Sequence, residues 1–308
     1  MTASVLDGKR IGEEIRAEVQ RGVRDLRSRG LRPPGLAAVL VGEDPASRVY
    51  VASKVKACGE AGVFSQRIEL PASASTAEVL ATVQELNGRP EIDGILVQLP
   101  LPRQVEEEAV LRAISPEKDV DGFHPVNFGL MTLDRPLFEP CTPAGILELL
   151  KRYQIPLEGR RAVVVGRSHI VGKPMAILLL RANATVTVCH SRTRNLAEVC
   201  READILVAAI GRKGTITAEH IREGAVVVDV GMNRVTDPEE ARVLFGGDEK
   251  RIGTVREKGA TLVGDVVPVA MWEKASWYTP VPGGVGPLTI AMLLSNTLKS
   301  ARRRLGVA

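Results

Sequence analysis

Aromatic residues are rare in this sequence of 308 residues, at 3% of the total, although 44% of the residues are hydrophobic. Hydrophobic cores must therefore be built from Val, Ile, Leu and Ala. No apolar run reaches the length of about 18 residues that a membrane-spanning helix needs, so we expect no membrane segment. The first residues also lack the basic stretch and apolar run of a secretory signal, and we expect a cytoplasmic protein.

A strong excess of one charge is also absent. The 41 Lys and Arg residues nearly balance the 37 Asp and Glu residues, for a net charge of +4. The basic residues are scattered, apart from Arg302–Arg304 near the end of a predicted helix, where cations are favoured. Nucleic acid is therefore not an expected partner. The four cysteines form no CxxC pair and have no histidine at zinc-finger spacing, so we expect buried free thiols and no metal site.

Helices and strands alternate regularly along the chain. A length of 308 residues favours two domains. In the first part, the spacing of apolar residues predicts helices near 8–29, 45–62 and 75–87 and strands at 36–41, 66–70 and 92–99. This order predicts a parallel sheet covered by helices.

A second alternation begins after residues 115–138, which are rich in Pro, Gly and Asp and predict a functional loop before the domain boundary. A helix is expected to begin at Thr142–Pro143. Strands are then predicted at 162–165, 185–189, 205–210, 226–230 and 261–266, with helices starting near Gly172, Asn195 and Thr217. Val-rich strands separated by helices are typical of a doubly wound Rossmann-type sheet.

Two stretches depart from this order. Residues 236–258 have mixed charges and predict a surface insertion. The segment Thr279–Thr289 holds three prolines and three glycines ahead of the last predicted helix, 287–304. Glycines let the backbone approach a ligand closely, and Pro287 fits the first turn of a helix. The segment is a candidate wall for a flat ligand, and a simple turn is the alternative interpretation.

The first strand of the second alternation leads into a candidate phosphate-binding turn, Gly166–Pro174. It differs from GxGxxG because Ser168 stands at the second glycine position. Gly166 allows a tight turn, and Gly172 opens a helix whose free N–H groups can face a phosphate. An ordinary strand-to-helix turn is the alternative, but the position of the motif between a strand and a helix favours dinucleotide binding.

The end of the next strand indicates which dinucleotide is bound. An NAD enzyme usually places Asp or Glu there, to bind the ribose 2′-hydroxyl. Here the segment Cys189–Thr193 offers hydroxyls and a cation instead, and Arg167 projects from the first turn. Such a pocket favours a 2′-phosphate, and therefore NADP. Arg192 and Arg194 as plain solvated loop residues are the alternative.

Candidate catalytic residues lie in the first domain. Tyr50 and Lys54 are four residues apart on a predicted helix and share a face. A partly desolvated lysine beside an aromatic ring can act as acid or base. Gln98 ends a strand, where its amide can orient a lysine. An exposed lysine lying over a tyrosine is the alternative.

Two carboxylates, Asp119 and Asp121, follow in a Gly/Pro-rich loop. Carboxylates there can accept hydrogen bonds from an amino-pyrimidine ring. A metal site is disfavoured because no adjacent ligand set accompanies them. A loop shaped by an Asx turn is the alternative.

Together these segments resemble the bifunctional methylenetetrahydrofolate dehydrogenase/methenyltetrahydrofolate cyclohydrolase family, of the bacterial FolD type. The matching motifs are spread in order over nearly the whole chain. They are Tyr50–Lys54 (YVASK), Val97–Pro102 (VQLPLP), Asp119–Gly122 (DVDG), Gly166–Ser168 (GRS), Val171–Pro174 (VGKP), His190–Ser191, Val230–Asn233 (VGMN) and Pro280–Pro287 (PVPGGVGP).

The resemblance implies a two-domain α/β fold. A folate-binding catalytic domain would cover 1–140, with the final helix at 285–308 returning to it. A Rossmann-type NADP-binding domain would cover 141–284, with a cleft between the two domains. It also implies a homodimer.

The resemblance further implies the roles of individual residues. Lys54 would be the central catalytic residue, Gln98 would hold and tune it, Tyr50 would pack on the folate, and Asp121 would bind the amino-pyrimidine edge. The implied folate contacts are Tyr50, Val97, Gln98, Leu99, Asp121, Pro282, Gly283 and Gly284. The implied NADP contacts are Gly166, Arg167, Ser168, Ser191 and Met232, with Arg167 and Ser191 near the 2′-phosphate.

The implied reactions are oxidation of 5,10-methylenetetrahydrofolate with NADP⁺ and hydrolysis of the methenyl product to 10-formyltetrahydrofolate in one-carbon metabolism. A dehydrogenase without cyclohydrolase activity and a nucleotide-binding module without turnover are the rival hypotheses. Two stretches depart from the family pattern. Residues 234–258 are longer than expected, and residues 266–277 carry Trp272 and Trp277 in unusual places.

Overall fold

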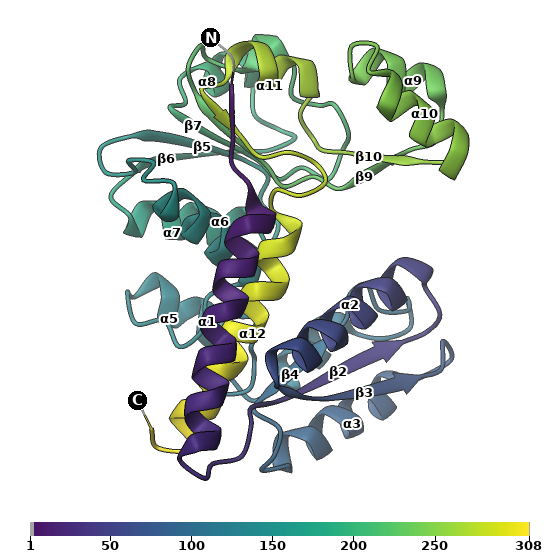
Figure 1. The fold of residues 1–308 in the computed structure, drawn as a ribbon, viewed down its shortest axis with the longest axis vertical. Helices are drawn as coiled ribbons and strands as arrows, with labels where there is room; N and C mark the ends of the chain where they lie inside the picture. Colours follow the sequence, from purple (N-terminus) through teal and green to yellow (C-terminus); the bar gives the residue numbers. More distant parts are fainter. Residues whose placement is uncertain (1–2, 308) are drawn as a thin grey trace. The chain divides into compact units, whose positions relative to one another are not determined.

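A computed structural model describes residues 3–307 and divides into two compact units (Figure 1). The N-terminal unit comprises Gly12–Cys141 and the described residues from Ile290 on. The C-terminal unit comprises Thr142–Thr289 and the described residues before Gly12. Among residues 3–307, no helix combines the length and the apolar character that crossing a membrane would require.

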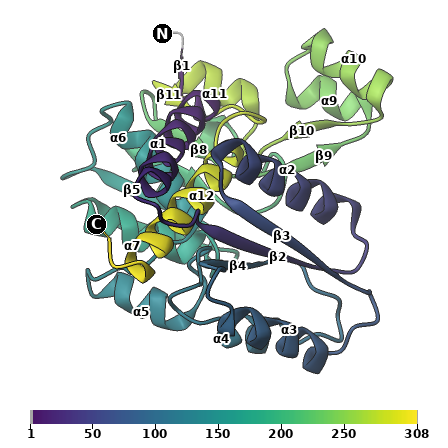
Figure 2. The ribbon, with the colours of Figure 1, turned by 60° about the horizontal axis from the view of Figure 1, so that its bottom comes forward.

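The N-terminal unit is built on a parallel sheet of three strands in the order β3–β2–β4. They are β2 (Gly35–Val41), β3 (Phe64–Leu70) and β4 (Gly94–Val97). Helices α2 (Pro45–Ala61) and α3 (Thr76–Gly88) cover opposite faces of the sheet (Figure 2). Alternate residues of β2 explain this: Leu36 and Leu40 pack in the core with α2, whereas Val39 packs in the core with α3. The predicted βαβαβ order is confirmed.

Local signals explain where these helices begin and end. Asp44 caps α2 by accepting from Ser47 N at 2.7 Å, and Pro45 occupies the first turn. Gly62 ends α2 in the left-handed conformation, with φ 75°. Ser75 and Glu78 form a capping box at the start of α3.

Two long helices complete the core of the N-terminal unit. Helices α1 (Gly8–Ser28) and α12 (Gly286–Arg304) contribute Val19, Val23, Leu293 and Leu298 to the same buried cluster as β2. Gly22 lets them approach closely, because a Cβ there would lie 2.5 Å from Leu298 Cδ2. Helix α12, far along the chain, therefore packs against β2 of the same unit.

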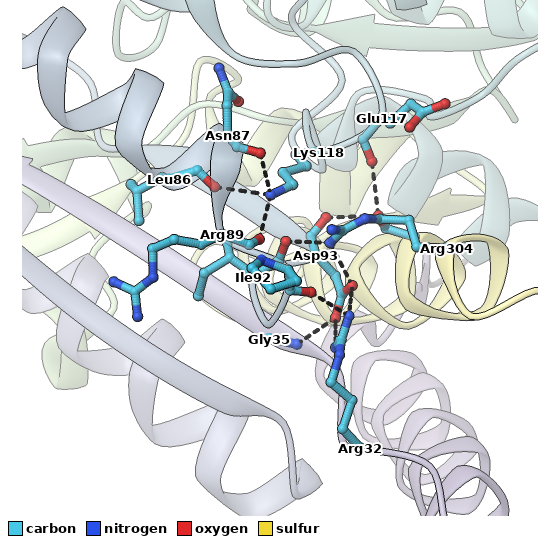
Figure 3. A network of polar contacts seen from close by, with 12 residues as sticks. Arg32, Gly35, Leu86, Asn87, Arg89, Ile92, Asp93, Glu117, Lys118 and Arg304 are labelled. Carbon is cyan, nitrogen blue, oxygen red and sulfur yellow. Dashed lines mark hydrogen bonds and ion pairs between the residues drawn. The ribbon is translucent and has the colours of Figure 1, made fainter.

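A polar network joins α12 to the sheet (Figure 3). Asp93 is fully buried and accepts from Gly35 N at 2.9 Å, and it pairs with Arg32 at 2.6 Å and Arg304 at 2.9 Å. Ser300 donates to the carbonyl oxygen of Asp93 at 2.7 Å. A buried charge with this many partners fixes the end of α12 against the start of β4.

Lys118 stabilises the end of α3 in the same region (Figure 3). Its Nζ donates to the carbonyl oxygens of Leu86, Asn87 and Arg89 at 2.7 to 2.9 Å. Carbonyl groups in the last turn of a helix lack their full set of intrahelical partners, and a cation is favoured at this end. Leu86 O here also accepts from Arg89 N at 3.3 Å. Burial, with Arg304 nearby, lowers the pKa of Lys118 to about 8, so the amine remains protonated at neutral pH.

The prediction of a loop over 115–138 is wrong in part. Helix α5 (Pro125–Thr132) forms there because Pro125 occupies its first position and His124 Nδ1 accepts from Val126 N. Helices α4 (Glu107–Ala113) and α6 (Cys141–Arg152) lie before and after this stretch.

The C-terminal unit contains a six-stranded sheet in the order β1–β11–β8–β7–β5–β6, with every pair parallel. The strands are β1 (Ser4–Val5), β5 (Arg161–Val165), β6 (Thr185–Cys189), β7 (Ile205–Ala208), β8 (Val226–Asp229) and β11 (Trp277–Tyr278). The predicted Rossmann-type sheet is confirmed. The sequence pattern did not reveal β1 and β11, because two residues are too few for a periodic signal.

Helices α7 (Gly172–Arg181), α8 (Leu196–Arg201) and α11 (Pro268–Lys274) belong to this unit, as does α6 from Thr142 on. Near Thr217, where a helix was expected, only the short 3₁₀ turn η1 (Ala218–His220) forms. It stops there because Ile221 turns into the core. Trp277 is explained by packing, since its ring meets Tyr153 edge to face at 5.4 Å.

Residues 236–258 form a small substructure rather than a bare loop. Helices α9 (Pro238–Leu244) and α10 (Glu249–Lys258) lie between β9 (Asn233–Val235) and β10 (Thr261–Val263), which pair antiparallel outside the main sheet. Six residues of β9, β10 and the helices between them form a separate buried cluster: Val235, Ala241, Phe245, Ile252, Val255 and Val263. The predicted strand at 261–266 is therefore shorter than expected and belongs to this ribbon.

We expect Asp93→Asn to lower the free energy of unfolding by about 3 kcal/mol, because it leaves Arg32 and Arg304 without a buried counter-charge. Urea unfolding followed by circular dichroism measures this. Glu43→Gln is the control, because Glu43 is 80% exposed in its pair with Arg48 and such pairs contribute little. Equal stability losses in both variants would contradict the role given to Asp93.

Candidate active site

Tyr50 and Lys54 lie one turn apart on α2. The Lys54 side chain is nearly buried, at 9% exposure, and Tyr50 is 39% exposed. Lys54 Nζ donates to Gln98 Oε1 at 3.1 Å. Helix α2 and the end of β4 therefore bring Lys54 and Gln98 together.

Gln98 is held in place by its neighbours. Its backbone N–H continues the sheet by donating to Val39 O at 2.9 Å, and its Nε2 donates to Leu99 O at 2.7 Å. With Nε2 engaged, Oε1 faces Lys54. Val97 differs from Gln98, because its side chain lies in the core beside α3 and only its backbone can reach a ligand.

Asp121 is a buried carboxylate, at 8% exposure. Burial raises its pKa to about 6, although the nearby Lys54 amine opposes that shift. The side chain therefore loses its proton just below neutral pH and carries a negative charge near Lys54. A buried carboxylate with one cation nearby is available to bind a polar ligand.

Hydrogen bonds from Asn296 on α12 fix the loop that carries Asp121. Asn296 Nδ2 donates to Val120 O at 2.8 Å and to Glu139 O at 3.2 Å, and the Cys141 thiol donates to Val120 O. Gly122 is required next to Asp121, because it has φ 77° and a Cβ there would lie 2.6 Å from Pro140 N. Sequence reasoning missed Asn296, which lies 176 residues from Val120.

Asp119 has a structural role. It is 2% exposed and accepts hydrogen bonds from Phe123 N, His124 N and Asn127 Nδ2. Its carboxylate shapes the loop into the start of α5. Asp119 therefore shapes the loop, but through N–H groups four and five residues on and not through the Asx turn of the alternative interpretation. Asp121 remains as the candidate ligand.

In the C-terminal unit, the turn after β5 has the close backbone approaches expected of a dinucleotide site. Gly166 has φ 133°, and a Cβ there would clash with the carbonyl oxygen of Ala209. A Cβ on Gly172 would clash in the same way with the carbonyl oxygen of Gly166. Ser168 Oγ accepts from the N–H groups of Val171 and Gly172, so this serine shapes the turn and caps α7.

A second turn lies beside the first, since Gly166 N donates to Cys189 O at 2.9 Å. It is closed by His190 N donating to Thr193 Oγ1 at 2.8 Å. The Arg167 and Ser191 side chains are exposed at these turns. The segment Cys189–Arg194 contains no carboxylate. These turns therefore fit a dinucleotide that carries a phosphate on its ribose.

Two buried carboxylates that sequence reasoning missed hold the loops at the carboxyl edge of the same sheet. Asp229 accepts from Gly231 N, Asp265 N and Val266 N at 2.8 to 3.0 Å. Burial raises the pKa of Asp229 to about 7. Sequence reasoning missed Asp229 because this residue ends a run of valines, a pattern that indicates only a buried strand.

Asp265 completes this arrangement. It accepts from Ile210 N at 2.6 Å, Gly211 N at 2.8 Å and Asn233 Nδ2 at 3.0 Å. The two carboxylates thus bind the loops that follow β7, β8 and β10. Met232, a predicted cofactor contact, lies between these bonded residues and is 46% exposed.

The Gly/Pro segment follows β11 at the same edge. Thr279 Oγ1 accepts from Asp229 N at 2.7 Å, Gly284 N donates to Pro280 O at 2.8 Å, and Gly283 O accepts from Lys9 N at 3.0 Å. A Cβ on Gly284 would lie 2.6 Å from Pro280 O, so only glycine fits there. Pro282 is exposed.

These features define a class of protein: an α/β enzyme with a dinucleotide-binding parallel sheet and a buried lysine–glutamine–aspartate group. Among residues 3–307, no cluster of His, Cys, Asp and Glu suited to a metal ion is found. All four cysteines are buried and free.

Comparisons with known proteins identify the family. The family described as "Tetrahydrofolate dehydrogenase/cyclohydrolase, catalytic domain" matches residues 6–121, and its "NAD(P)-binding domain" matches residues 140–305. The chain is 56% identical to the bifunctional protein FolD of Koribacter versatilis, over 99% of each chain.

Solved structures agree with the family match. The FolD enzyme of Campylobacter jejuni superposes with a TM-score of 0.88 at 44% identity, covering 98% of this chain and 99% of that one. The Trypanosoma brucei dehydrogenase-cyclohydrolase gives a TM-score of 0.90 at 38% identity, covering 99% of each. This chain belongs to the tetrahydrofolate dehydrogenase/cyclohydrolase family.

We expect Asp121→Asn to stabilise the protein near pH 7.5 by roughly 3 kcal/mol, with little gain near pH 4. The folded-state pKa of about 6 lies above the ordinary value of 3.8. The stability that the carboxyl contributes is therefore complete below about pH 4 and is lost as the pH rises through about 6. Urea unfolding at both pH values measures the difference.

Glu107→Gln provides the control, because Glu107 is an exposed residue in the first turn of α4. It should change stability equally little at both pH values. A stability difference between Asp121→Asn and the wild type that does not vary with pH would contradict the pKa assigned to Asp121.

Proposed function

We propose that this protein oxidises 5,10-methylenetetrahydrofolate with NADP⁺ and hydrolyses the methenyl product to 10-formyltetrahydrofolate, within one-carbon folate interconversion. The observation that carries the proposal is the 3.1 Å hydrogen bond from Lys54 Nζ to Gln98 Oε1. Family membership supports both reactions, and the relatives are named as bifunctional enzymes.

Lys54 serves the hydrolytic step. Water adds to the methenyl carbon and loses one proton to give a neutral carbinolamine. A ring nitrogen is then protonated as the C–N bond breaks, and the remaining hydroxyl proton leaves as the formyl C=O forms and the ring opens. A side chain that accepts and returns a proton lowers both barriers. Gln98 Oε1 binds one N–H of Lys54 and so orients the amine, which is consistent with the near burial of Lys54.

Asp121 and Tyr50 bind the folate. The Asp121 carboxylate is ionised at neutral pH and accepts hydrogen bonds from the amino-pyrimidine edge of the pterin. Tyr50 lies one turn before Lys54 on α2 and is exposed enough to pack on a flat ring. Val97 and Leu99 contribute backbone groups, and Pro282, Gly283 and Gly284 contribute the stiff wall of the Gly/Pro segment.

NADP supplies the hydride acceptor when it is bound. Gly166 and Ser168 form the phosphate-binding turn, and Arg167 with Ser191 binds the 2′-phosphate. Met232 contacts the nicotinamide half. The Trypanosoma brucei relative was solved with NADP, which supports this choice of cofactor. Asp229 and Asp265 position the loops around the cofactor without contacting it, because both are buried.

The rival functions fit the chain less well. A dehydrogenase that has lost cyclohydrolase activity has no need of a lysine bonded to a glutamine beside a buried carboxylate. A nucleotide-binding module without turnover has no need of Lys54 at all.

The setting of the enzyme is also a proposal. Four buried free cysteines are consistent with a reducing compartment, and we place the enzyme in the cytoplasm. By its family resemblance the protein acts as a homodimer.

We expect Lys54→Met to lower the cyclohydrolase rate by roughly 10²- to 10⁴-fold, because it removes the proton-transfer group, while the fold survives. The assay supplies 5,10-methylenetetrahydrofolate and NADP⁺ and follows NADPH and the methenyl compound separately. The wild type should form NADPH with little methenyl compound, and the variant should accumulate it.

Lys56→Met on the same helix is the matched control, since Lys56 is 79% exposed and pairs with Glu60 on the surface of α2. A Lys54→Met protein that hydrolyses the methenyl compound normally would refute the catalytic role. A wild type that binds NADP without turnover would favour the binding module.

We expect Arg167→Ala to weaken NADP binding by roughly 10- to 100-fold and NAD binding far less, because the lost charge-assisted hydrogen bonds go only to the 2′-phosphate. Titration calorimetry with both dinucleotides measures this. Arg181→Ala, at the far end of α7, is the control. Equal losses for both dinucleotides would count against the assignment.

A further inference from the structure

The insertion between β9 and β10 is a structured part of the C-terminal unit. Figures 1 and 2 show α9 and α10 at the end of the β9–β10 ribbon. Its buried cluster includes Phe245 and Ile252 from the insertion and Val235 and Val263 from the two strands. Because these side chains pack closely on one another, the insertion is rigid and can hold the neighbouring segments that it contacts in place.

The insertion is attached to the rest of its unit at several points besides the ribbon. Lys213 Nζ pairs with Glu240 at 2.6 Å. A Cβ on Gly214 would lie 3.0 Å from Leu244 Cδ2, and a Cβ on Gly246 would lie 2.8 Å from Val269 Cγ2. Helix α9 and the turn after it are thus packed closely on neighbouring segments.

Arg251 makes the contact that matters for the site. It lies on α10, and its guanidinium stacks over the Phe245 ring at 5.0 Å. Its Nη1 donates to Thr261 Oγ1 at 3.3 Å, and its Nη2 donates to Val281 O at 2.7 Å. Arginine suits this position because one planar group can stack and donate in two directions at once.

Val281 belongs to the Gly/Pro segment, which is short of side chains that could hold it. The segment is bonded to its surroundings on either side of this residue: Thr279 to Asp229 before it, and Gly283 O to Lys9 N after it. Between these two points, the hydrogen bond from Arg251 holds the Val281 carbonyl. The insertion therefore supplies a hydrogen bond that helps to hold the middle of the segment.

We propose that Arg251 is a positioning residue for folate binding. Through the Val281 carbonyl it keeps Pro282, Gly283 and Gly284 in the conformation that meets the folate ring. This inference rests on the proposed function, because it takes the segment to line the folate site. It gives the insertion a function, which is to support the substrate wall from outside the main sheet.

Arg251→Met tests the proposal, because methionine keeps the apolar packing and loses every donor. We expect the KM for 5,10-methylenetetrahydrofolate to rise about tenfold, the size of one lost hydrogen bond to a charged group, with kcat within about twofold. The Kd for NADP should stay within about twofold. Arg251→Lys should recover part of the loss, since it keeps one donor for Val281.

Arg242→Met is the matched control. Arg242 lies on α9 and pairs with Glu239 and Glu249 within the insertion. It removes the same charge without touching Val281, so the KM should not change. Equal KM changes in both variants, or a parallel loss of NADP affinity, would show that Arg251 acts only through general stability and would overturn the proposal.

Hydrogen exchange tests the same inference without turnover. The Gly284 N–H bonds to Pro280 O inside the segment. Arg251→Met should speed its exchange about tenfold, the same factor as one lost hydrogen bond to a charged group, and Arg242→Met should leave it unchanged. A wild type without turnover refutes the proposed function alone, whereas unchanged Gly284 exchange in Arg251→Met refutes the role of Arg251.

Discussion

The constraint on which the site depends is that every backbone N–H at the carboxyl edge of a parallel sheet needs a partner once it is buried. In the C-terminal unit, the strand ends at Ala208 and Asp229 lead into loops whose N–H groups point inward. Asp229 and Asp265 accept six hydrogen bonds from these loops, counting the Asn233 amide. Without these carboxylates the loops would be left with unsatisfied donors at a cost of about 1–3 kcal/mol each.

The N-terminal unit meets the same constraint with different side chains. Asn296 satisfies the carbonyl oxygens of Val120 and Glu139, and Lys118 satisfies those at the end of α3. Two of the candidate site residues take part in the same task, because Gln98 donates to Leu99 O and Ser168 accepts from the N–H groups of Val171 and Gly172. Asp121 differs, because it is buried with few donors around it. Its raised pKa reflects the stability cost of burying a carboxylate.

The parts of the fold that sequence could predict are those that follow from local patterns. Asp44 followed by Pro45 marks the start of α2, and the valine runs mark β5 and β8. Tyr50, Lys54 and Gln98 were predictable as a group because helix spacing and a strand end place them, and the structure joins Lys54 to Gln98 directly.

The parts that could not be predicted depend on partners far along the chain. Asn296 is an ordinary polar residue on an amphipathic helix until that helix packs beside Val120. Strands β1 and β11 exist because each pairs with the sheet, and two residues carry no pattern alone. Asp119 and Asp121 look alike in sequence, and only their hydrogen bonds separate a residue that shapes the loop from one that can face a ligand.

The insertion shows how a segment outside the main sheet can be stable beside a candidate site. Added residues must bury enough apolar surface to offset their own conformational entropy. Phe245, Ile252 and Val255 do so within the insertion, and the antiparallel ribbon joins both its ends to the unit. Because the insertion has its own buried core, its surface residues are not needed for its stability and can contact neighbouring segments. The contact from Arg251 to Val281 falls on a segment with few side chains to hold it, so in the proposed role of Arg251 this is where support from outside the segment matters most for the folate site.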